Sequence, residues 1–92
     1  MNEAKKASCI KYLESRRYIE PENKLVIRTV EQLEEMGITD CQILTADPRK
    51  LIDILIQRDV DKGRAPCHKR RIMCINRYIS FLDQYNPEEA AI

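Results

Sequence analysis

The chain has 92 residues, with sixteen lysines and arginines against fifteen aspartates and glutamates, so its formal net charge is only +1. A chain of this length forms one small domain with little room for an enclosed active site, which weighs against an enzyme. Hydrophobic residues make up 43% and charged residues 34%, with only two glycines and four prolines, which is the composition of a folded helical protein.

The N-terminus and the cysteines indicate the compartment. The opening MNEAKKASC mixes charges of both signs, unlike a secretory signal. The longest apolar run, around LIDILI, is interrupted by Asp53 and is too short to cross a bilayer. No CxxC pair occurs among the four cysteines, and their wide spacing favours free thiols over disulfides: Cys9, Cys41, Cys67 and Cys74. These features predict a cytoplasmic protein that does not enter a membrane.

Helical periodicity recurs in four segments, of which the first covers about residues 3–18. Ile10 and Leu13 are its apolar anchors. The second helix follows Pro21, is capped by Glu22 or Asn23, and ends at Gly37, which supplies a left-handed stop. Its predicted buried stripe consists of Leu25, Val26, Thr29, Val30, Leu33 and Met36.

A connector over residues 38–44, too short for a long helix, leads to the third predicted helix. Thr45 or Asp47 caps this helix, and Pro48 is tolerated in its first turn because the amides there lack intrahelical partners. Apolar residues cover well over half of its circumference: Leu51, Ile52, Ile54, Leu55 and Ile56. This distribution predicts a central helix packed on more than one side.

The last predicted helix begins around residues 65–67, after Gly63 and Pro66, and runs to about Tyr85. Its core stripe is predicted to be Ile72, Ile75, Ile79 and Leu82. The opposite side then carries Lys69, Arg70, Met73, Asn76, Arg77 and Ser80, with Arg71 and Tyr78 at the edge. We therefore expect an all-α fold, a single four-helix bundle or orthogonal helix array over residues 1–86, with 87–92 beginning a linker or a C-terminal tail.

The charges are segregated along the chain. Every charged side chain between Lys62 and Leu82 is positive, whereas acidic residues gather at the end of the second helix: Glu31, Glu34, Glu35 and Asp40. Adjacent like charges repel one another, so this arrangement costs stability unless a polyanion is present. Phosphate groups of a nucleic acid are the obvious polyanion, and an ordinary solvated helix face is the alternative.

The run RAPCHKRRIMCINRYISFL resembles the last helix of the core-binding domain of tyrosine recombinases, the phage-integrase family. The family pattern there is approximately S-P-x-T-hydrophobic-x-R-R-L-x-x-L-R-x-F-F-x-F-L. The matching positions are Arg70 and Arg71 for the paired arginines, Ile72 and Ile75 for the leucines, Tyr78 and Ile79 for the paired aromatics, and Phe81 and Leu82 for the final pair. The departures are Cys67 in place of Thr, Asn76 in place of Arg, and PENK in place of a Ser-x-x-Thr opening of the second helix.

Upstream, LTADPRKLIDILIQRD is similar to the preceding helix of the family, and the segment from KASCIKYL to EEMGI resembles its two opening helices. The resemblance implies a SAM-like domain whose second and fourth helices grip double-stranded DNA, while a separate catalytic domain performs strand exchange. Other recombinase protomers on the same DNA would be further partners. The DNA-binding residues it implies, together with those of the basic segment, are Lys24, Arg28, Arg64, Lys69, Arg70, Arg71, Asn76 and Arg77.

No catalytic residue, metal or cofactor is expected in this chain. It has a single histidine, and Cys67 and Cys74 lie two helical turns apart, roughly 10 Å, too far to share a zinc ion directly. The alternative function is a protein-interaction module, adaptor or death-fold-like, in which the basic helix pairs with the glutamates of a neighbour. A continuous positive face joining Lys24 and Arg28 to the last helix would favour DNA.

Overall fold

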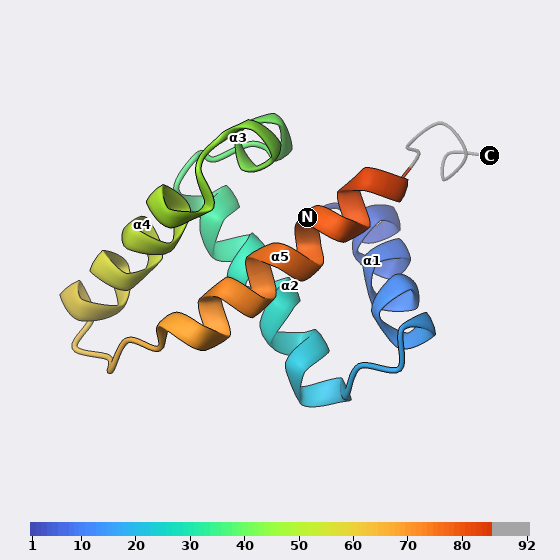
Figure 1. The fold of residues 1–92 in the computed structure, drawn as a ribbon, viewed down its shortest axis with the longest axis horizontal. Helices are drawn as coiled ribbons and strands as arrows, with labels where there is room; N and C mark the ends of the chain where they lie inside the picture. The colour runs from blue at the N-terminus through green and yellow to red at the C-terminus, as the bar shows by residue number, and fades with distance from the viewer. Residues whose placement is uncertain (86–92) are drawn as a thin grey trace.

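The computed structural model describes residues 1–85, and every regular element in that range is a helix (Figure 1). The elements are α1 (Glu3–Ser15), α2 (Glu20–Glu35), α3 (Asp40–Thr45), α4 (Pro48–Asp61) and α5 (His68–Gln84). The all-α prediction is confirmed, with one helix more than the four expected. Within the described part of the chain, no helix is both long and apolar enough to cross a membrane. The tail expected at 87–92 lies outside the described residues.

The predicted end of α2 and the predicted start of α4 are confirmed, whereas the connector between them and the start of α2 differ from the predictions. Gly37, with φ of +81°, follows the end of α2, and the Asp47 carboxylate caps α4 by accepting from the Arg49 amide at 3.0 Å. The connector folds into α3 because Thr39 and Gln42 form a capping box. Capping of α2 by Glu22 or Asn23 was wrong: the helix begins at Glu20, with Pro21 inside its first turn, where a missing amide costs little.

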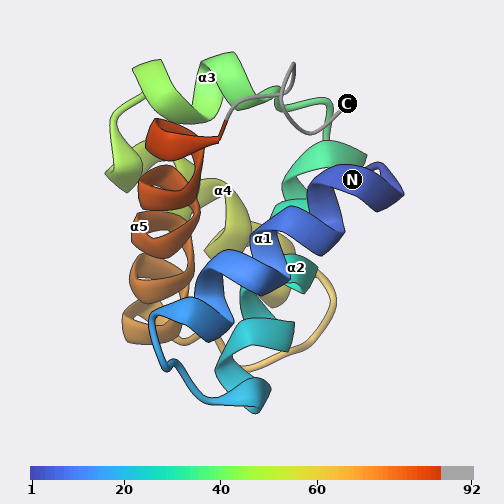
Figure 2. The same cartoon turned by 90° about the vertical axis from the view of Figure 1, so that its right-hand side faces the viewer.

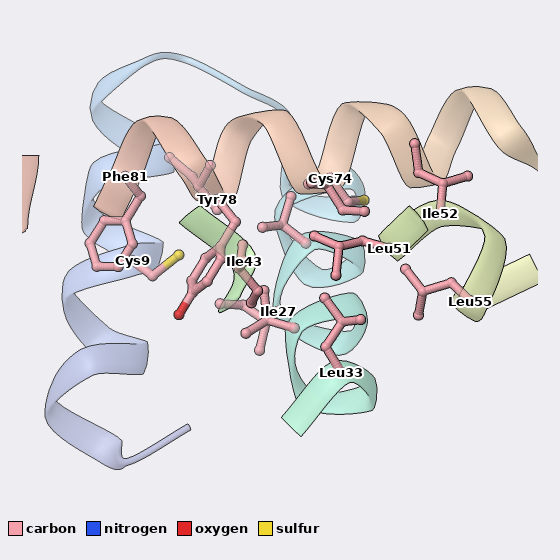
Figure 3. Packing of buried hydrophobic residues seen from close by; sticks show 14 residues of the cluster. Cys9, Ile27, Leu33, Ile43, Leu51, Ile52, Leu55, Cys74, Tyr78 and Phe81 are labelled. Atoms are coloured by element: carbon pink, nitrogen blue, oxygen red, sulfur yellow. The ribbon is translucent and has the colours of Figure 1, made fainter. Parts of the chain in front are cut away.

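The core forms where α5 crosses α2. Helix α1 packs on one side of this pair and α4 on the other, with α3 against α5 (Figures 1 and 2). Buried side chains from all five helices meet there, including Cys9, Leu33, Ile43, Leu55 and Phe81 (Figure 3). The prediction that the LIDILI helix is central was wrong. Helix α4 is peripheral, because only one side of it faces α5 and Ile54 remains exposed.

The buried face of α5 is rotated from the predicted one. Its buried residues are Arg71, Cys74, Ile75, Tyr78 and Phe81, whereas Ile72 is 43% exposed. These positions recur at intervals of three and four residues, so they form one regular stripe. Polar atoms are tolerated in this stripe because they have partners: the Tyr78 hydroxyl, for example, donates to Asp40 Oδ1 at 2.7 Å.

The four cysteines fall into two classes. Cys9 and Cys74 are buried, and Cys41 and Cys67 are exposed. Burial raises the pKa of the Cys9 thiol to about 12 and also raises the pKa of the Cys74 thiol. Because the thiolate is the reactive species, we expect an aromatic disulfide reagent to label two thiols in the folded protein and four after denaturation. A variant with Cys41→Ser and Cys67→Ser should show no rapid labelling. Rapid labelling of three or four thiols in the native protein would contradict this packing.

Candidate nucleic-acid interface

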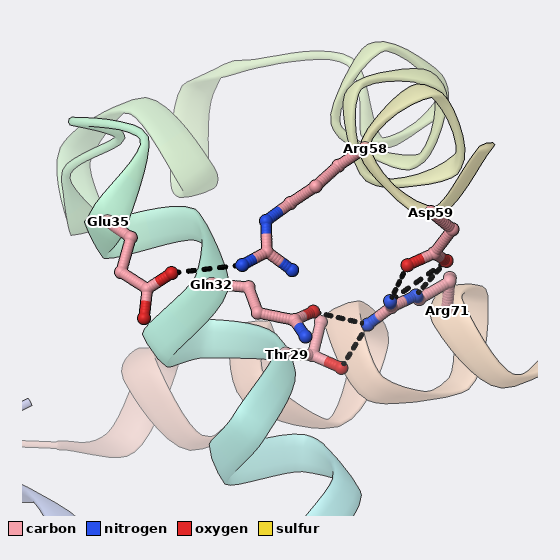
Figure 4. A network of polar contacts seen from close by, with 6 residues as sticks. All are labelled: Thr29, Gln32, Glu35, Arg58, Asp59 and Arg71. Atoms are coloured by element: carbon pink, nitrogen blue, oxygen red, sulfur yellow. Dashed lines mark hydrogen bonds and ion pairs between the residues drawn. The ribbon is translucent and has the colours of Figure 1, made fainter. Parts of the chain in front are cut away.

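Arg71 lies inside the protein and joins three helices. From α5 its guanidinium pairs with Asp59 on α4, with Nη2 to Oδ1 at 2.7 Å, and Nη1 donates to Thr29 Oγ1 at 3.1 Å and Gln32 Oε1 at 2.8 Å on α2 (Figure 4). Further bonds from Nε and Nη2 reach Asp59 Oδ2. These five contacts engage all three nitrogens of the guanidinium. The prediction that Arg71 reaches phosphate from the helix edge was therefore wrong, because the residue is only 8% exposed and each of its guanidinium nitrogens bonds to Asp59, Thr29 or Gln32.

Arg77 also has partners within the chain. Its Nη1 donates to Glu22 Oε1 at 3.1 Å, and its guanidinium carbon lies 3.7 Å from the centre of the Tyr18 ring. The side chain is 18% exposed. A cation over an aromatic face, paired with a carboxylate, holds α5 against the start of α2. Arg77 therefore belongs to the packing of α5, and not to an open cationic face as the helical periodicity predicted.

Four other predicted cations gather around the start of α5. Arg28 of α2, Arg64 of the α4–α5 linker and Arg70 of α5 line one hollow, and Lys69 and Arg70 line the adjoining one. All four are exposed, and no carboxylate within residues 1–85 forms an ion pair with them. We call these four residues the cationic patch. They come from segments up to 42 positions apart in the sequence, and only the fold brings them together.

The buried ion pair of Asp59 and Arg71 lies next to the cationic patch. Asp59 and Arg71 line the same hollow as Arg28, Arg64 and Arg70. The backbone carbonyl of Asp59 accepts a hydrogen bond from the Arg64 amide at 2.8 Å, so this residue positions the linker as well as Arg71. Because the charges of Asp59 and Arg71 offset each other, the hollow keeps the positive charge of the patch.

The first turn of α5 adds to the positive potential. Its N-cap residue, Cys67, makes no side-chain capping bond, and no acidic residue lies in the first turn. The amides at the start of a helix point outward and carry the positive end of the helix dipole. Phosphate groups bind readily at such helix ends. The patch and the first turn of α5 therefore favour the same kind of ligand.

Two predicted DNA-binding residues lie outside the cationic patch. Lys24 is exposed on α2, pairs with Glu20 one turn earlier at 3.3 Å, and lines the groove between α1 and α2. Asn76 is exposed on α5, seven residues beyond Lys69, which is roughly 10 Å along the helix. A continuous positive face joining Lys24 and Arg28 to α5 was expected to favour DNA over a protein partner. Arg28 shares a hollow with the cations of α5, whereas Lys24 lines neither hollow of the cationic patch.

The acidic end of α2 is largely paired within the chain. Glu34 pairs with the N-terminal amine, Glu35 pairs with Arg58 at 3.0 Å, and Asp40 pairs with Lys5. Glu31 forms no ion pair within residues 1–85 and lines the groove between α1 and α2 together with Arg28. The three paired carboxylates line neither hollow of the cationic patch. They also have intramolecular cations already, which reduces their availability to a basic helix of a second molecule.

The hollow lined by Arg28, Arg64 and Arg70 has a volume of about 180 Å³. Pockets that enclose small molecules usually measure about 300–1,000 Å³. This hollow is smaller than that range, whereas the adjoining hollow lined by Lys69 and Arg70 measures about 410 Å³. No family model, curated protein or solved structure matches the chain. The nature of the ligand is therefore inferred from the charge and geometry of the patch.

Proposed function

We propose that this chain is a DNA-binding module whose cationic patch contacts the phosphates of a duplex. The observation that carries the proposal is the gathering of four cations, without a carboxylate partner among residues 1–85, in a chain whose formal net charge is only +1. Like charges held close together repel one another, and a polyanion removes that repulsion. Arginine and lysine side chains are well suited to phosphate, and the first turn of α5 adds amide donors.

The aromatic residues favour a duplex over a single strand. Proteins that bind single strands usually stack bases on exposed aromatic rings. Within residues 1–85 every tyrosine and phenylalanine side chain is buried or half-buried, and only the smaller imidazole of His68 is an exposed aromatic ring. Tyr12, Tyr78 and Tyr85 pack around Phe81, and Tyr18 is covered by Arg77. The patch thus offers phosphate contacts without an exposed tyrosine or phenylalanine ring on which bases could stack, which predicts affinity with little sequence preference.

The resemblance to the core-binding domain of tyrosine recombinases gives the proposal a biological role. In that role the module grips DNA inside the cytoplasm while a separate catalytic domain performs strand exchange, with other protomers on the same DNA. The paired arginines of the family pattern have different roles in this chain. Arg70 belongs to the cationic patch, and Arg71 holds α5 onto α2 and α4. A role as a protein-interaction module has less support, because Glu34 and Glu35 already pair within the chain.

Fluorescence anisotropy with short labelled oligonucleotides tests the proposal. At low salt we expect two duplexes of unrelated sequence to bind with similar affinity, and the corresponding single strand to bind more weakly. The reason is that phosphate contacts carry no sequence information, whereas single-strand affinity depends on base stacking. Failure of both duplexes to bind at low salt, or tighter binding of the single strand, would contradict the proposal.

A further inference from the structure

The hollow that contains Lys69 and Arg70 lies between the start of α2 and the first turns of α5, and we call it the α2–α5 hollow. Most of its other lining residues are apolar: Ile19, Pro21, Leu25 and Met73. The phosphates of a duplex would pair with the two cations, but they carry no bulky apolar group that could cover these side chains. The apolar lining therefore has no role in the proposed DNA binding.

Ile19 is the most exposed part of this apolar lining that the fold does not explain. It is 60% exposed, more than any other large apolar side chain within residues 1–85. It is the N-cap residue of α2, a position where serine, threonine, aspartate and asparagine are preferred because they accept hydrogen bonds from the first amides. Its side chain makes no such bond. Covering Ile19 with a partner would remove apolar surface from water and so stabilise the complex.

The charge of the α2–α5 hollow favours an anion. Its one carboxylate, Glu22, pairs with Arg77 at 3.1 Å, so the negative charge is already offset. Lys69 and Arg70 have no carboxylate partner within residues 1–85. Arg70 also lines the adjoining hollow, which contains two further exposed arginines. A ligand whose apolar group lies in the α2–α5 hollow can therefore place several negative charges beside cations.

We propose that the α2–α5 hollow is the docking site for a short acidic segment of a protein partner, in which one bulky apolar side chain is flanked by aspartates or glutamates. The apolar side chain packs against Ile19, Leu25 and Met73, and the carboxylates pair with Lys69 and Arg70. The hollow measures about 410 Å³, so it has room for a side chain. Complementary charge selects such a segment, and the apolar contact adds affinity.

The partner is a different protein, because the acidic end of α2 in a second copy of this chain is already occupied: Glu34 and Glu35 pair within the chain. The segment and a duplex compete for Lys69 and Arg70, so this partner displaces DNA. That competition rests on the proposed DNA binding, whereas the docking itself does not.

Three labelled peptides test the docking by fluorescence anisotropy with the full chain. The first has one leucine flanked on each side by two glutamates, the second has alanine in place of leucine, and the third has glutamines in place of the glutamates. We expect the alanine peptide to bind about tenfold more weakly, because it leaves the apolar lining uncovered. The glutamine peptide should bind about fivefold more weakly at low salt, through the loss of two exposed ion pairs. No saturable binding of the leucine peptide, or equal affinity of the leucine and alanine peptides, would overturn the proposal.

Two serine variants locate the binding. Ile19→Ser removes exposed apolar surface from the hollow and gives α2 a favourable N-cap residue, so the fold should be retained. The preference for leucine over alanine should then fall to about threefold. Leu44→Ser removes another exposed apolar side chain, on α3, which lies far from the start of α2 (Figures 1 and 2), and should leave the preference unchanged. An unchanged preference in Ile19→Ser would overturn the proposed site.

Two further measurements separate the docking from its alternatives. Unlabelled duplex should displace the leucine peptide, and a duplex that binds without displacing it would overturn the pairing with Lys69 and Arg70. If no duplex binds at low salt while the leucine peptide keeps its preference, the docking site stands and the proposed DNA binding fails. Dimers of the unbound chain in sedimentation equilibrium that Ile19→Ser abolishes would overturn the proposal in favour of a second copy in the hollow.

Discussion

Replacing Arg71 by alanine is expected to lower the free energy of unfolding by about 3–5 kcal/mol, the usual cost of removing one partner of a buried ion pair. Asp59 would be left as an uncompensated charge at 5% exposure, and Thr29 and Gln32 would each lose a donor. Small domains have a total stability of only about 5–15 kcal/mol. Urea denaturation followed by circular dichroism at the helical band should therefore show a large shift to lower urea.

Arg70 provides the matched control, because it is the neighbouring arginine on the same helix and is exposed. Arg70→Ala should change the stability by no more than about 0.5 kcal/mol, as for most surface substitutions. Combining Arg71→Met with Asp59→Leu should recover much of the stability that Arg71→Ala loses, because an apolar pair leaves no charge buried. Equal urea midpoints for Arg70→Ala and Arg71→Ala would show that the buried network does not form.

Replacing both Arg64 and Arg70 by alanine is expected to weaken duplex binding by on the order of 100-fold at about 50 mM salt, if each contacts one phosphate. The slope of log affinity against log salt should fall in magnitude by about 0.9 for each lost contact. Both residues are exposed, so thermal denaturation should give nearly the wild-type melting temperature. Arg77 is unsuitable for this test, because alanine there also removes the contacts with Glu22 and Tyr18.

A double variant of Arg49 and Lys50 controls for net charge. Both residues are exposed at the start of α4, whereas the cationic patch lies beyond the end of that helix. Their replacement by alanine removes the same charge as the Arg64 and Arg70 pair but should leave the salt dependence of binding close to that of the wild type. Equal losses of affinity in the two double variants would mean that binding follows overall charge and that the patch has no special role.

The helix boundaries could be predicted from the sequence where a local signal determines them. Gly37 and the Asp47–Pro48 pair fixed two such boundaries, because left-handed backbone and N-terminal capping depend only on adjacent residues. Helix α3 has a local signal too, since Thr39 and Gln42 have the spacing of a capping box. That signal was overlooked because the segment has only six residues and no long apolar stripe.

The burial of Arg71 could be predicted only in part. Hydrophobic periodicity assigned the core of α5 to three isoleucines and Leu82 and placed Arg71 at the edge of the opposite face. A local hint was present on α4, where Asp59 lies four residues beyond Leu55 on the buried stripe and therefore needs a cation. Which cation it receives depends on how α4 and α5 pack, and no local pattern determines that. The same holds for Arg77, whose partner Glu22 is 55 positions away.

For the cationic patch, too, the sequence predicts the exposure of single residues but not their position relative to one another. Helical spacing identified Lys69 and Arg70 as exposed cations, the run of positive charges included Arg64, and the resemblance added Arg28. The structure places all four at the surface. Their gathering around the start of α5 depends on the crossing of α2 and α5 and on the linker held by Asp59. Sequence patterns within one helix contain no information about that crossing.

The salt dependence of duplex binding by the wild-type protein tests the central claim most directly. If the four cations of the patch each neutralise one phosphate, the log–log slope should be about −3.6. Raising the salt from about 50 mM to about 200 mM should then weaken binding by roughly 150-fold in fluorescence anisotropy. A duplex affinity that does not change with salt, or no binding at the lowest salt, would contradict the proposal that the patch binds DNA phosphates.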